Sequence, residues 1–290
     1  MRLKNFETPF KNYDLKKLFS LYEKNGYVKL GKVITDNYAK KLANVTDDLM
    51  MGRRTYPGMF FKLDDPDGNY YNIKHEDIEN EKFTVPSDRY KKIKDLEYVP
   101  EFLNCIKMKI LKKFSEKYIG KEASSMRAMI FNKTNKNSSI LPFHQDVSNQ
   151  WKMSKKPSFT LWMSLNGATK KNGCLKVIEG SHKYGVLSDR NKSSSTNLTK
   201  EDEKKLKKKH KVVFLELKPG EAVILSNYTV HGSDENKTKK NRLGFAFCLM
   251  DAKIRNLKTN KYYPKIFGKN SLNLSKILKL KKIPKKVYEK

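Results

Sequence analysis

Beyond Gly120 the chain consists largely of short apolar segments separated by turn-forming dipeptides, and this pattern restricts the fold more than any other feature of the sequence. The segments with this character are 126–131, 159–165, 174–178, 212–217, 222–225 and 243–250. The dipeptides between them end in glycine: Asn166-Gly167, Asn172-Gly173, Glu179-Gly180 and Pro219-Gly220. Short strands punctuated in this way are typical of an all-β barrel or a double-sheet jelly roll. We therefore expect mainly β structure with flanking helices, interrupted by a charged helix at 199–211.

The first 120 residues have a different character, and we expect a largely helical part whose loops cover the pocket. Apolar spacing predicts helices over 15–25, from an Asp36 N-cap to about Met50, and over 100–118, with a short strand at 28–33. Residues 53–94 are rich in proline, glycine and aromatic side chains, which favours an ordered loop region over a flexible linker.

The expected organisation is one domain over residues 1–290, with a β core at 121–251 and a basic tail at 252–290. The tail is expected to be disordered or packed on the surface, and a short basic amphipathic helix at 272–286 is the alternative. Such a tail could contact anionic surfaces, because its basic residues far outnumber its acids.

The formal net charge of +31 is conspicuous, but it identifies no partner. Only eight of the 62 basic residues are arginine, the residue that makes bidentate contacts with phosphate and guanine. A lysine excess of this kind favours a compositional bias spread over solvated faces. We therefore expect no specific nucleic-acid partner.

Cysteine usage and apolar run length bear on the class of protein. The three cysteines, Cys105, Cys174 and Cys248, are odd in number and lack metal-site spacing, which argues against a disulfide-built secreted fold and a structural zinc site. No segment approaches the roughly 20 apolar residues that a bilayer-spanning helix needs. No apolar run follows the basic residues near the N-terminus, so a signal peptide is not expected. These features predict a cytoplasmic protein without transmembrane segments.

Two of the five histidines have neighbourhoods that suit a metal. In the triplet His144-Gln145-Asp146, an extended backbone places residues i and i+2 on the same face, so an imidazole and a carboxylate can act together. His231 follows a buried-looking strand, at the position where a barrel displays ligands on its rim. Two histidines and one carboxylate are the facial triad of non-haem Fe(II) oxygenases. The similar triplet at 75–77 lies in the aromatic region outside any strand pattern, and we interpret it as a surface turn.

Arg242 opens the apolar segment 243–250, eleven residues after His231. An arginine at the start of a core strand is costly to desolvate unless it meets an anion. A bound dicarboxylate would supply that anion in bidentate geometry. Neither His182 nor His210 is followed by an arginine at this spacing, so neither is expected in the site.

These residues lie in stretches that resemble the phytanoyl-CoA dioxygenase family of iron- and 2-oxoglutarate-dependent oxygenases. The resembling stretches are 25–28, 131–133, 141–146, 172–182 and 231–242, within roughly residues 15–251. The resemblance implies a single oxygenase domain with a double-stranded β-helix, the cupin-like jelly roll. Thr134 stands where the family often has proline, a departure that touches only a loop.

The same resemblance implies roles for individual residues. The Fe(II) ligands, which are also the catalytic residues, would be His144, Asp146 and His231. Arg242 and Ser233 match the anchor of the 5-carboxylate of 2-oxoglutarate, while Trp162 and, more loosely, Met129 match positions near this co-substrate. The implied reaction hydroxylates a substrate with O2 and gives succinate and CO2. The carboxylate of Asp146 favours hydroxylation, because related halogenases generally have glycine or alanine at that position.

Three functions stay open at this point. The first is an Fe(II)- and 2-oxoglutarate-dependent hydroxylase of a small molecule or an acyl thioester. The second is a non-enzymatic basic β-fold module that binds nucleic acid or an anionic membrane. The third is a metal-dependent β-barrel enzyme without 2-oxoglutarate, against which the position of Arg242 argues. For the enzyme we expect substrate contacts from Gln145, Arg53 and Arg54, with loops at 53–94 and 183–209 as walls of the pocket.

Overall fold

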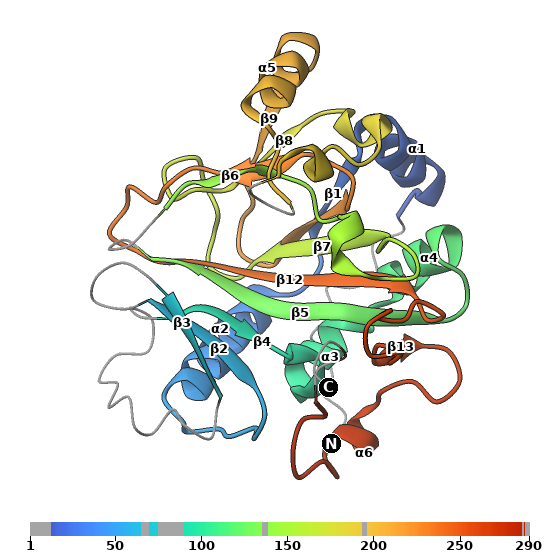
Figure 1. Ribbon diagram of the computed structural model, residues 1–290. Helices are drawn as coiled ribbons and strands as arrows, with labels where there is room; N and C mark the ends of the chain where they lie inside the picture. The colour runs from blue at the N-terminus through green and yellow to red at the C-terminus, as the bar shows by residue number, and fades with distance from the viewer. Residues whose placement is uncertain are drawn as a thin grey trace.

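Two antiparallel sheets face each other in the computed structural model, which describes residues 13–64, 70–74, 90–134, 139–192, 196–285 and 287. In Figure 1 the smaller sheet lies above the larger one, and helices cover the lower face of the larger sheet. The arrangement is a double-stranded β-helix, the jelly roll expected from the sequence. The predicted mainly β jelly roll with flanking helices is confirmed.

The larger sheet has nine strands within the described residues, in the order β1-β10-β7-β12-β5-β4-β2-β3, and β13 also pairs with β5. The strands are β1 (Tyr27–Lys32), β2 (Phe60–Asp64), β3 (Tyr70–Lys74), β4 (Tyr90–Lys94), β5 (Ala123–Lys133), β7 (Phe159–Ser164), β10 (Glu221–Ser226), β12 (Arg242–Asp251) and β13 (Lys265–Phe267). The smaller sheet has the order β6-β11-β8-β9 and is built from β6 (Leu141–His144), β8 (Leu175–Ile178), β9 (Val212–Leu215) and β11 (His231–Ser233).

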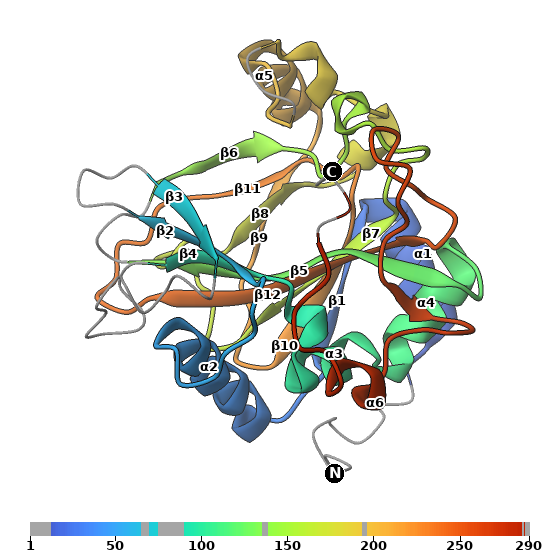
Figure 2. The same ribbon diagram turned by 60° about the horizontal axis from the view of Figure 1, so that its bottom comes forward.

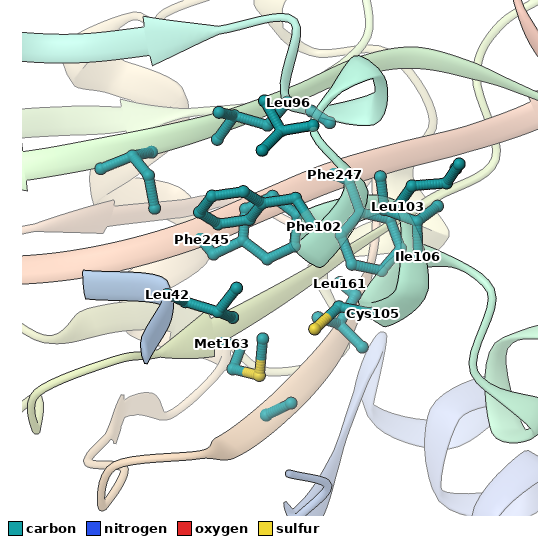
Figure 3. Close-up of a cluster of buried hydrophobic side chains, with 14 of the residues drawn as sticks. Leu42, Leu96, Phe102, Leu103, Cys105, Ile106, Leu161, Met163, Phe245 and Phe247 are labelled. Atoms are coloured by element: carbon teal, nitrogen blue, oxygen red, sulfur yellow. The ribbon is translucent and has the colours of Figure 1, made fainter. Parts of the chain in front are cut away.

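Alternation along β12 separates the core from the interior between the sheets. Phe245 and Phe247 point to the lower face, where they join the main hydrophobic cluster together with Phe102. The rings of Phe102 and Phe245 have centroids 4.8 Å apart, and Figure 3 shows the aromatic side chains together with Leu42 and Met163. The residue between the two phenylalanines points to the opposite face, because successive side chains of a strand alternate. That opposite face is free to carry the polar groups of a site.

Helices supply the cover of the lower face, as Figures 1 and 2 show for α2 and α3. The α-helices are α1 (Leu15–Asn25), α2 (Asp36–Met50), α3 (Pro100–Ile106), α4 (Lys109–Tyr118), α5 (Lys200–Lys209) and α6 (Leu274–Ile277). Short 3-10 turns lie at Leu96–Tyr98, Asn149–Trp151, Ser181–Tyr184 and Ser188–Arg190.

Two helix predictions need correction. The N-cap of α2 is Thr35, whose hydroxyl accepts from the amide of Tyr38 at 3.2 Å, and Asp36 is the first helical residue. The single helix predicted over 100–118 is two helices, because the chain turns at Lys107 and Met108 between α3 and α4.

The prediction of a loop region over 53–94 is wrong for its described part. β2, β3 and β4 lie there and extend the larger sheet beyond β5, so the first 120 residues contribute four strands and are less helical than expected. Phe61 and Ile93 are fully buried in the main hydrophobic cluster. Lysines between the apolar residues of these strands obscure the alternation that would have revealed them.

The basic segment after 251 is packed against the rest of the molecule. β13 pairs with β5, and the predicted helix at 272–286 is reduced to the four residues of α6. Ile277 and Ile283 are buried, and the amide of Ile283 donates to the carbonyl of Pro57 at 2.8 Å. Among the described residues, no helix combines the length and the apolar character needed to cross a bilayer.

Candidate metal centre

Two histidines stand opposite each other on neighbouring strands of the smaller sheet. His144 ends β6 and His231 begins β11; the two are paired in the antiparallel register, with ring centroids 4.2 Å apart. Asp146 follows β6, and its backbone amide donates to the carbonyl of Asn227 at 2.9 Å. One ligand atom from each of the three side chains lies within 4.8 Å of the others. The structure thus brings together all three residues that the sequence singled out.

Backbone carbonyls orient both imidazole rings. Nδ1 of His144 lies 2.9 Å from the carbonyl of Pro142, and Nδ1 of His231 lies 2.9 Å from the carbonyl of Thr229. Because a carbonyl only accepts, Nδ1 carries the hydrogen in each ring, and Nε2 keeps its lone pair for a metal. Burial and, after it, the neighbouring His231 lower the pKa of His144 to about 3, so this ring is neutral at physiological pH.

Arg127, on β5, forms an ion pair with the carboxylate of Asp146. Burial alone would raise the pKa of Asp146, but Arg127 and the two imidazoles outweigh it and hold this pKa well below its usual range. The carboxylate is therefore ionised and available as a ligand. Its Oδ2 lies 3.8 Å from Nε2 of His231. Two imidazoles and one carboxylate form the donor set that suits Fe(II).

Sequence reasoning missed Arg127, although a signal existed. It lies in the apolar segment 126–131, so the argument applied to Arg242, that a strand arginine needs an anion, applies to it as well. The sequence could not indicate that the anion that pairs with Arg127 is Asp146, which lies after a different strand, β6.

Arg242 is a buried cation whose Nε has no hydrogen-bond partner, and no ion pair joins its guanidinium to the described residues. The guanidinium lies over the ring of Trp162, 5.2 Å from the ring centroid. Burial lowers the pKa of Arg242 to about 10, a shift that the nearby Cys174 only partly opposes. A desolvated cation of this kind fits a carboxylate that comes from outside the chain.

Close packing fixes the indole of Trp162 on the floor of this space. Trp162 on β7 and Gly244 on β12 lie on adjacent strands, and a Cβ atom at position 244 would come within 2.3 Å of the indole. Glycine at 244 therefore leaves the room that the ring occupies. Ser233, two residues after His231, is 1% exposed and lies on the same side.

A cavity of about 70 Å³ joins these groups. Its lining contains six of the predicted site residues, namely His144, Asp146, His231, Arg242, Ser233 and Trp162. Met129 lies elsewhere, in the wall of a neighbouring cavity of about 340 Å³, and Arg127 lines both cavities. The structure therefore does not bring Met129 to the predicted co-substrate position.

The three residues expected to contact substrate occupy other places. The carboxamide of Gln145 is buried and fully bonded to backbone: Nε2 donates to Gly185 and Tyr228 at 2.8 and 2.6 Å, and Oε1 accepts from Leu187 and Ser188 at 2.7 and 3.1 Å. Gln145 thus holds the loop beside the site and has no group left for a substrate.

Arg53 and Arg54 lie at the end of α2, away from both cavities. Arg53 pairs with Asp48 at 2.7 Å, and Arg54 pairs with Glu101 of α3 at 3.0 Å. Arg54 thus joins the end of α2 to α3, whereas Arg53 makes a local ion pair at the end of α2. The triplet at 75–77 lies outside the described residues.

Comparison with known structures supports the architecture. The non-heme alpha ketoglutarate dependent carbocyclase SnoK from nogalamycin biosynthesis superposes with a TM-score of 0.61 at 15% identity, over 86% of this chain and 88% of that chain. EctD from S. alaskensis in its apoform gives a TM-score of 0.63 at 17% identity, over 88% and 84% of the two chains. At such identities the likeness shows the fold.

Sequence comparison shows the family. A "phytanoyl-CoA dioxygenase domain-containing protein 1 homolog" of Dictyostelium discoideum is 33% identical over 86 residues, 28% of this chain and 31% of that protein. The peroxisomal phytanoyl-CoA dioxygenase of Bos taurus is 25% identical over 202 residues, 66% of this chain and 57% of that protein. The chain thus spans less than two thirds of the length of these relatives. The model of the phytanoyl-CoA dioxygenase family matches residues 22–244, which include the three candidate ligands and Arg242, and the chain therefore belongs to the phytanoyl-CoA dioxygenase family.

Proposed function

We propose that this protein is an Fe(II)- and 2-oxoglutarate-dependent dioxygenase that hydroxylates a small organic molecule or an acyl thioester, with O2 as oxidant and succinate and CO2 as co-products. The observation that carries the proposal is the juxtaposition of two sites in one cavity. A His-Asp-His donor set lies on one side, and the buried Arg242, which has no anionic partner among the described residues, lies on the other.

Each chain residue has a defined task in this reaction. Nε2 of His144, Nε2 of His231 and the carboxylate of Asp146 would hold the ferrous ion, and three protein donors leave its other positions to small ligands. The bound ion and 2-oxoglutarate supply the oxidising chemistry by which O2 is activated. Arg127 keeps Asp146 ionised and fixes its orientation.

The anchoring residues select the co-substrate by charge and length. Arg242 would donate in bidentate fashion to the carboxylate farthest from the metal, and the hydroxyl of Ser233 lines the same cavity. Trp162 covers one face of the guanidinium, which excludes water from the ion pair. The retained carboxylate of Asp146 supports hydroxylation as the outcome, since it takes the position that a halide would need.

Anaerobic titration of the purified protein with Fe(II) and 2-oxoglutarate tests this proposal. The expected result is a weak visible charge-transfer band that requires both additions. His144→Ala should abolish the band, while His210→Ala, a histidine outside both cavities, should retain it. A band that survives in His144→Ala would overturn the ligand assignment. Absence of the band in the wild type, with DNA binding that weakens steeply with salt, would favour the basic binding module instead.

We also propose a cytoplasmic location. It is supported by the three cysteines, which are buried and form no disulfide, as is usual in a reducing compartment. Cell fractionation with an antibody tests this. Recovery of the protein in an organelle fraction would contradict it; the Bos taurus relative is named as a peroxisomal protein.

A further inference from the structure

A second cavity of about 340 Å³ adjoins the metal centre and is the larger of the two. The two cavities share the side chain of Arg127, whose guanidinium pairs with the candidate ligand Asp146. A molecule in the second cavity would therefore lie one side chain away from the metal ligands. That position suits the compound that is oxidised.

The chain after residue 251 builds one wall of this cavity. Tyr263, Pro264 and Val287 line it from one side, and Met129 of β5 lines it from the sheet. The wall is fixed by hydrogen bonds to the core: the carbonyl of Pro264 accepts from the amide of Ser125 at 2.9 Å.

Two further contacts secure the end of this wall. The amide of Ile283 donates to the carbonyl of Pro57 at 2.8 Å, and the hydroxyl of Thr259 donates to the carbonyl of Val287. Ile283 itself is buried. The segment is thus a built part of the cavity, held at both ends and between them.

This wall lies outside the part of the chain that the family model matches, residues 22–244. The metal ligands and Arg242 lie inside that match, whereas Tyr263 and Val287 do not. The candidate co-substrate site therefore lies within the matched region, and the far wall of the second cavity lies beyond it. Selectivity for a substrate would follow from that wall.

We propose that the second cavity is the substrate chamber, that the segment 263–287 determines its selectivity, and that it takes a compact amphiphilic molecule without net charge. This inference rests on the proposed function. The substrate is a neutral or zwitterionic small molecule. A polyanionic nucleotide group such as coenzyme A does not enter the chamber.

The lining supports this class through its chemistry. Methionine, proline and valine side chains provide apolar contact for the body of the molecule, and Tyr263 adds an aromatic ring with a polar tip. Lys94 and Lys285 are balanced by the carboxylates of Asp95 and Glu97, and the charge of Arg127 is matched by Asp146. A lining in which cations and carboxylates nearly balance adds little local attraction for a polyanion to that of the strongly basic chain as a whole.

The size of the cavity points the same way. Its volume lies near the lower end of the roughly 300–1,000 Å³ of typical ligand pockets, which suits a compact molecule. A coenzyme A moiety would have to stay outside it.

Calorimetric titration of the protein loaded with redox-inert Zn(II) and 2-oxoglutarate tests the chamber. The probes are N-acetyl-L-phenylalaninamide as the neutral compound, L-phenylalanine as the zwitterion and octanoyl-CoA as the polyanion. We expect the neutral and the zwitterionic probe to bind, and the affinity for octanoyl-CoA to be lower by about tenfold or more. Val287→Trp, which fills the chamber, should lower the affinity for the neutral and the zwitterionic probe by about tenfold or more, and Val287→Phe should act in the same direction.

Leu278→Trp is the matched control, because Leu278 lies on the same segment, is 70% exposed and does not line the cavity. It should leave probe binding unchanged. The proposal of a substrate chamber would be overturned if neither the neutral nor the zwitterionic probe bound, or if octanoyl-CoA bound with equal affinity. Undiminished probe binding in both Val287 variants would also overturn it. Retained 2-oxoglutarate binding in the Val287 variants shows that they fold. Failure of the wild type to bind 2-oxoglutarate at all would instead refute the proposed function.

Discussion

Arg127 of β5 and Asp146 of the segment after β6 form an ion pair that crosses from the large sheet to the metal-binding edge of the small sheet. The pair joins the two cavities, because Arg127 lines both. It also explains how the carboxylate of Asp146 stays ionised although it is buried. Arg127 is therefore a positioning residue for the metal centre.

Arg127→Gln should weaken divalent-metal binding by about 10–100-fold, the usual effect of removing a group that orients a ligand. Without the guanidinium, burial raises the pKa of Asp146, so metal should also be lost at a higher pH on acidification than in the wild type. Competition for Co(II) with a chromophoric chelator measures both effects. Arg190→Gln, which removes an exposed arginine paired with Asp202, is the control and should bind metal normally.

Gly244→Ala should destabilise the fold and displace the indole of Trp162. The new methyl group would lie 2.3 Å from the ring, and overpacking of this kind costs about 1–3 kcal/mol. Urea unfolding measures the loss in the free energy of unfolding. The double variant Trp162→Phe/Gly244→Ala should recover part of the lost free energy of unfolding, because the smaller ring leaves room for the methyl group. Equal stability of the single and double variants would contradict a clash between this methyl group and the indole.

Binding of 2-oxoglutarate should weaken as the pH rises from 6.5 to 8.5. Burial and the neighbouring Arg242 lower the pKa of Lys133 to about 7. Lys133 stands opposite Arg242 in the strand register, so a bound carboxylate there would favour the ammonium form and raise this pKa.

The bound state then holds more protons than the free state, which makes binding tighter at low pH by up to about tenfold per pH unit. Titrations with 2-oxoglutarate at three pH values check the sign. Lys133→Met should remove the dependence, and Lys171→Met should not. A pH-independent affinity in the wild type would contradict the linkage.

Ile283→Ala should lower the free energy of unfolding by about 2–4 kcal/mol, because it empties a buried site where the chain after residue 251 is anchored. Leu280→Ala, at a position that is 41% exposed, should change it by less than about 0.5 kcal/mol. Thermal melts of the two variants give the comparison. Equal melting temperatures would show that the anchor contributes little to stability.

The sequence predicted two of the candidate metal ligands well because their placement depends on a local pattern. In His144-Gln145-Asp146 the two-residue spacing places both ligands on one face, and the structure confirms that they converge with His231. The same rule sends Gln145 to the other face, where its carboxamide bonds to backbone, so its prediction as a substrate contact ignored the alternation that identified its neighbours.

What the sequence could not supply were the partners of long-range contacts. Arg54 pairs with Glu101 across 47 positions, and nothing in the local pattern distinguishes this arginine from one that faces a pocket. Strand β2 contains Lys62, and β4 contains Lys91, Lys92 and Lys94, so neither sequence shows a clear apolar face until the neighbouring strand β5 is known. The limits lie where the environment of a residue is set by a distant segment.

The pairing of His144 with His231 has a consequence for the mechanics of the smaller sheet. β6 ends the strand order of the smaller sheet, where it pairs with β11 on one side. Its other side is held by two hydrogen bonds: the amide of Leu198 donates to the carbonyl of Phe143, and that of Gln145 to the carbonyl of Thr196, both at 3.0 Å. A metal held by both histidines would act as a staple across this pair, and it would fix the register, since a slip by one residue turns His144 to the opposite face. Metal occupancy and fraying of this strand pair are then thermodynamically linked. The amide hydrogens of Leu141, Phe143 and His144 should exchange more slowly when the ion is bound, because a metal at this position would also stabilise the strand pair that carries its ligands.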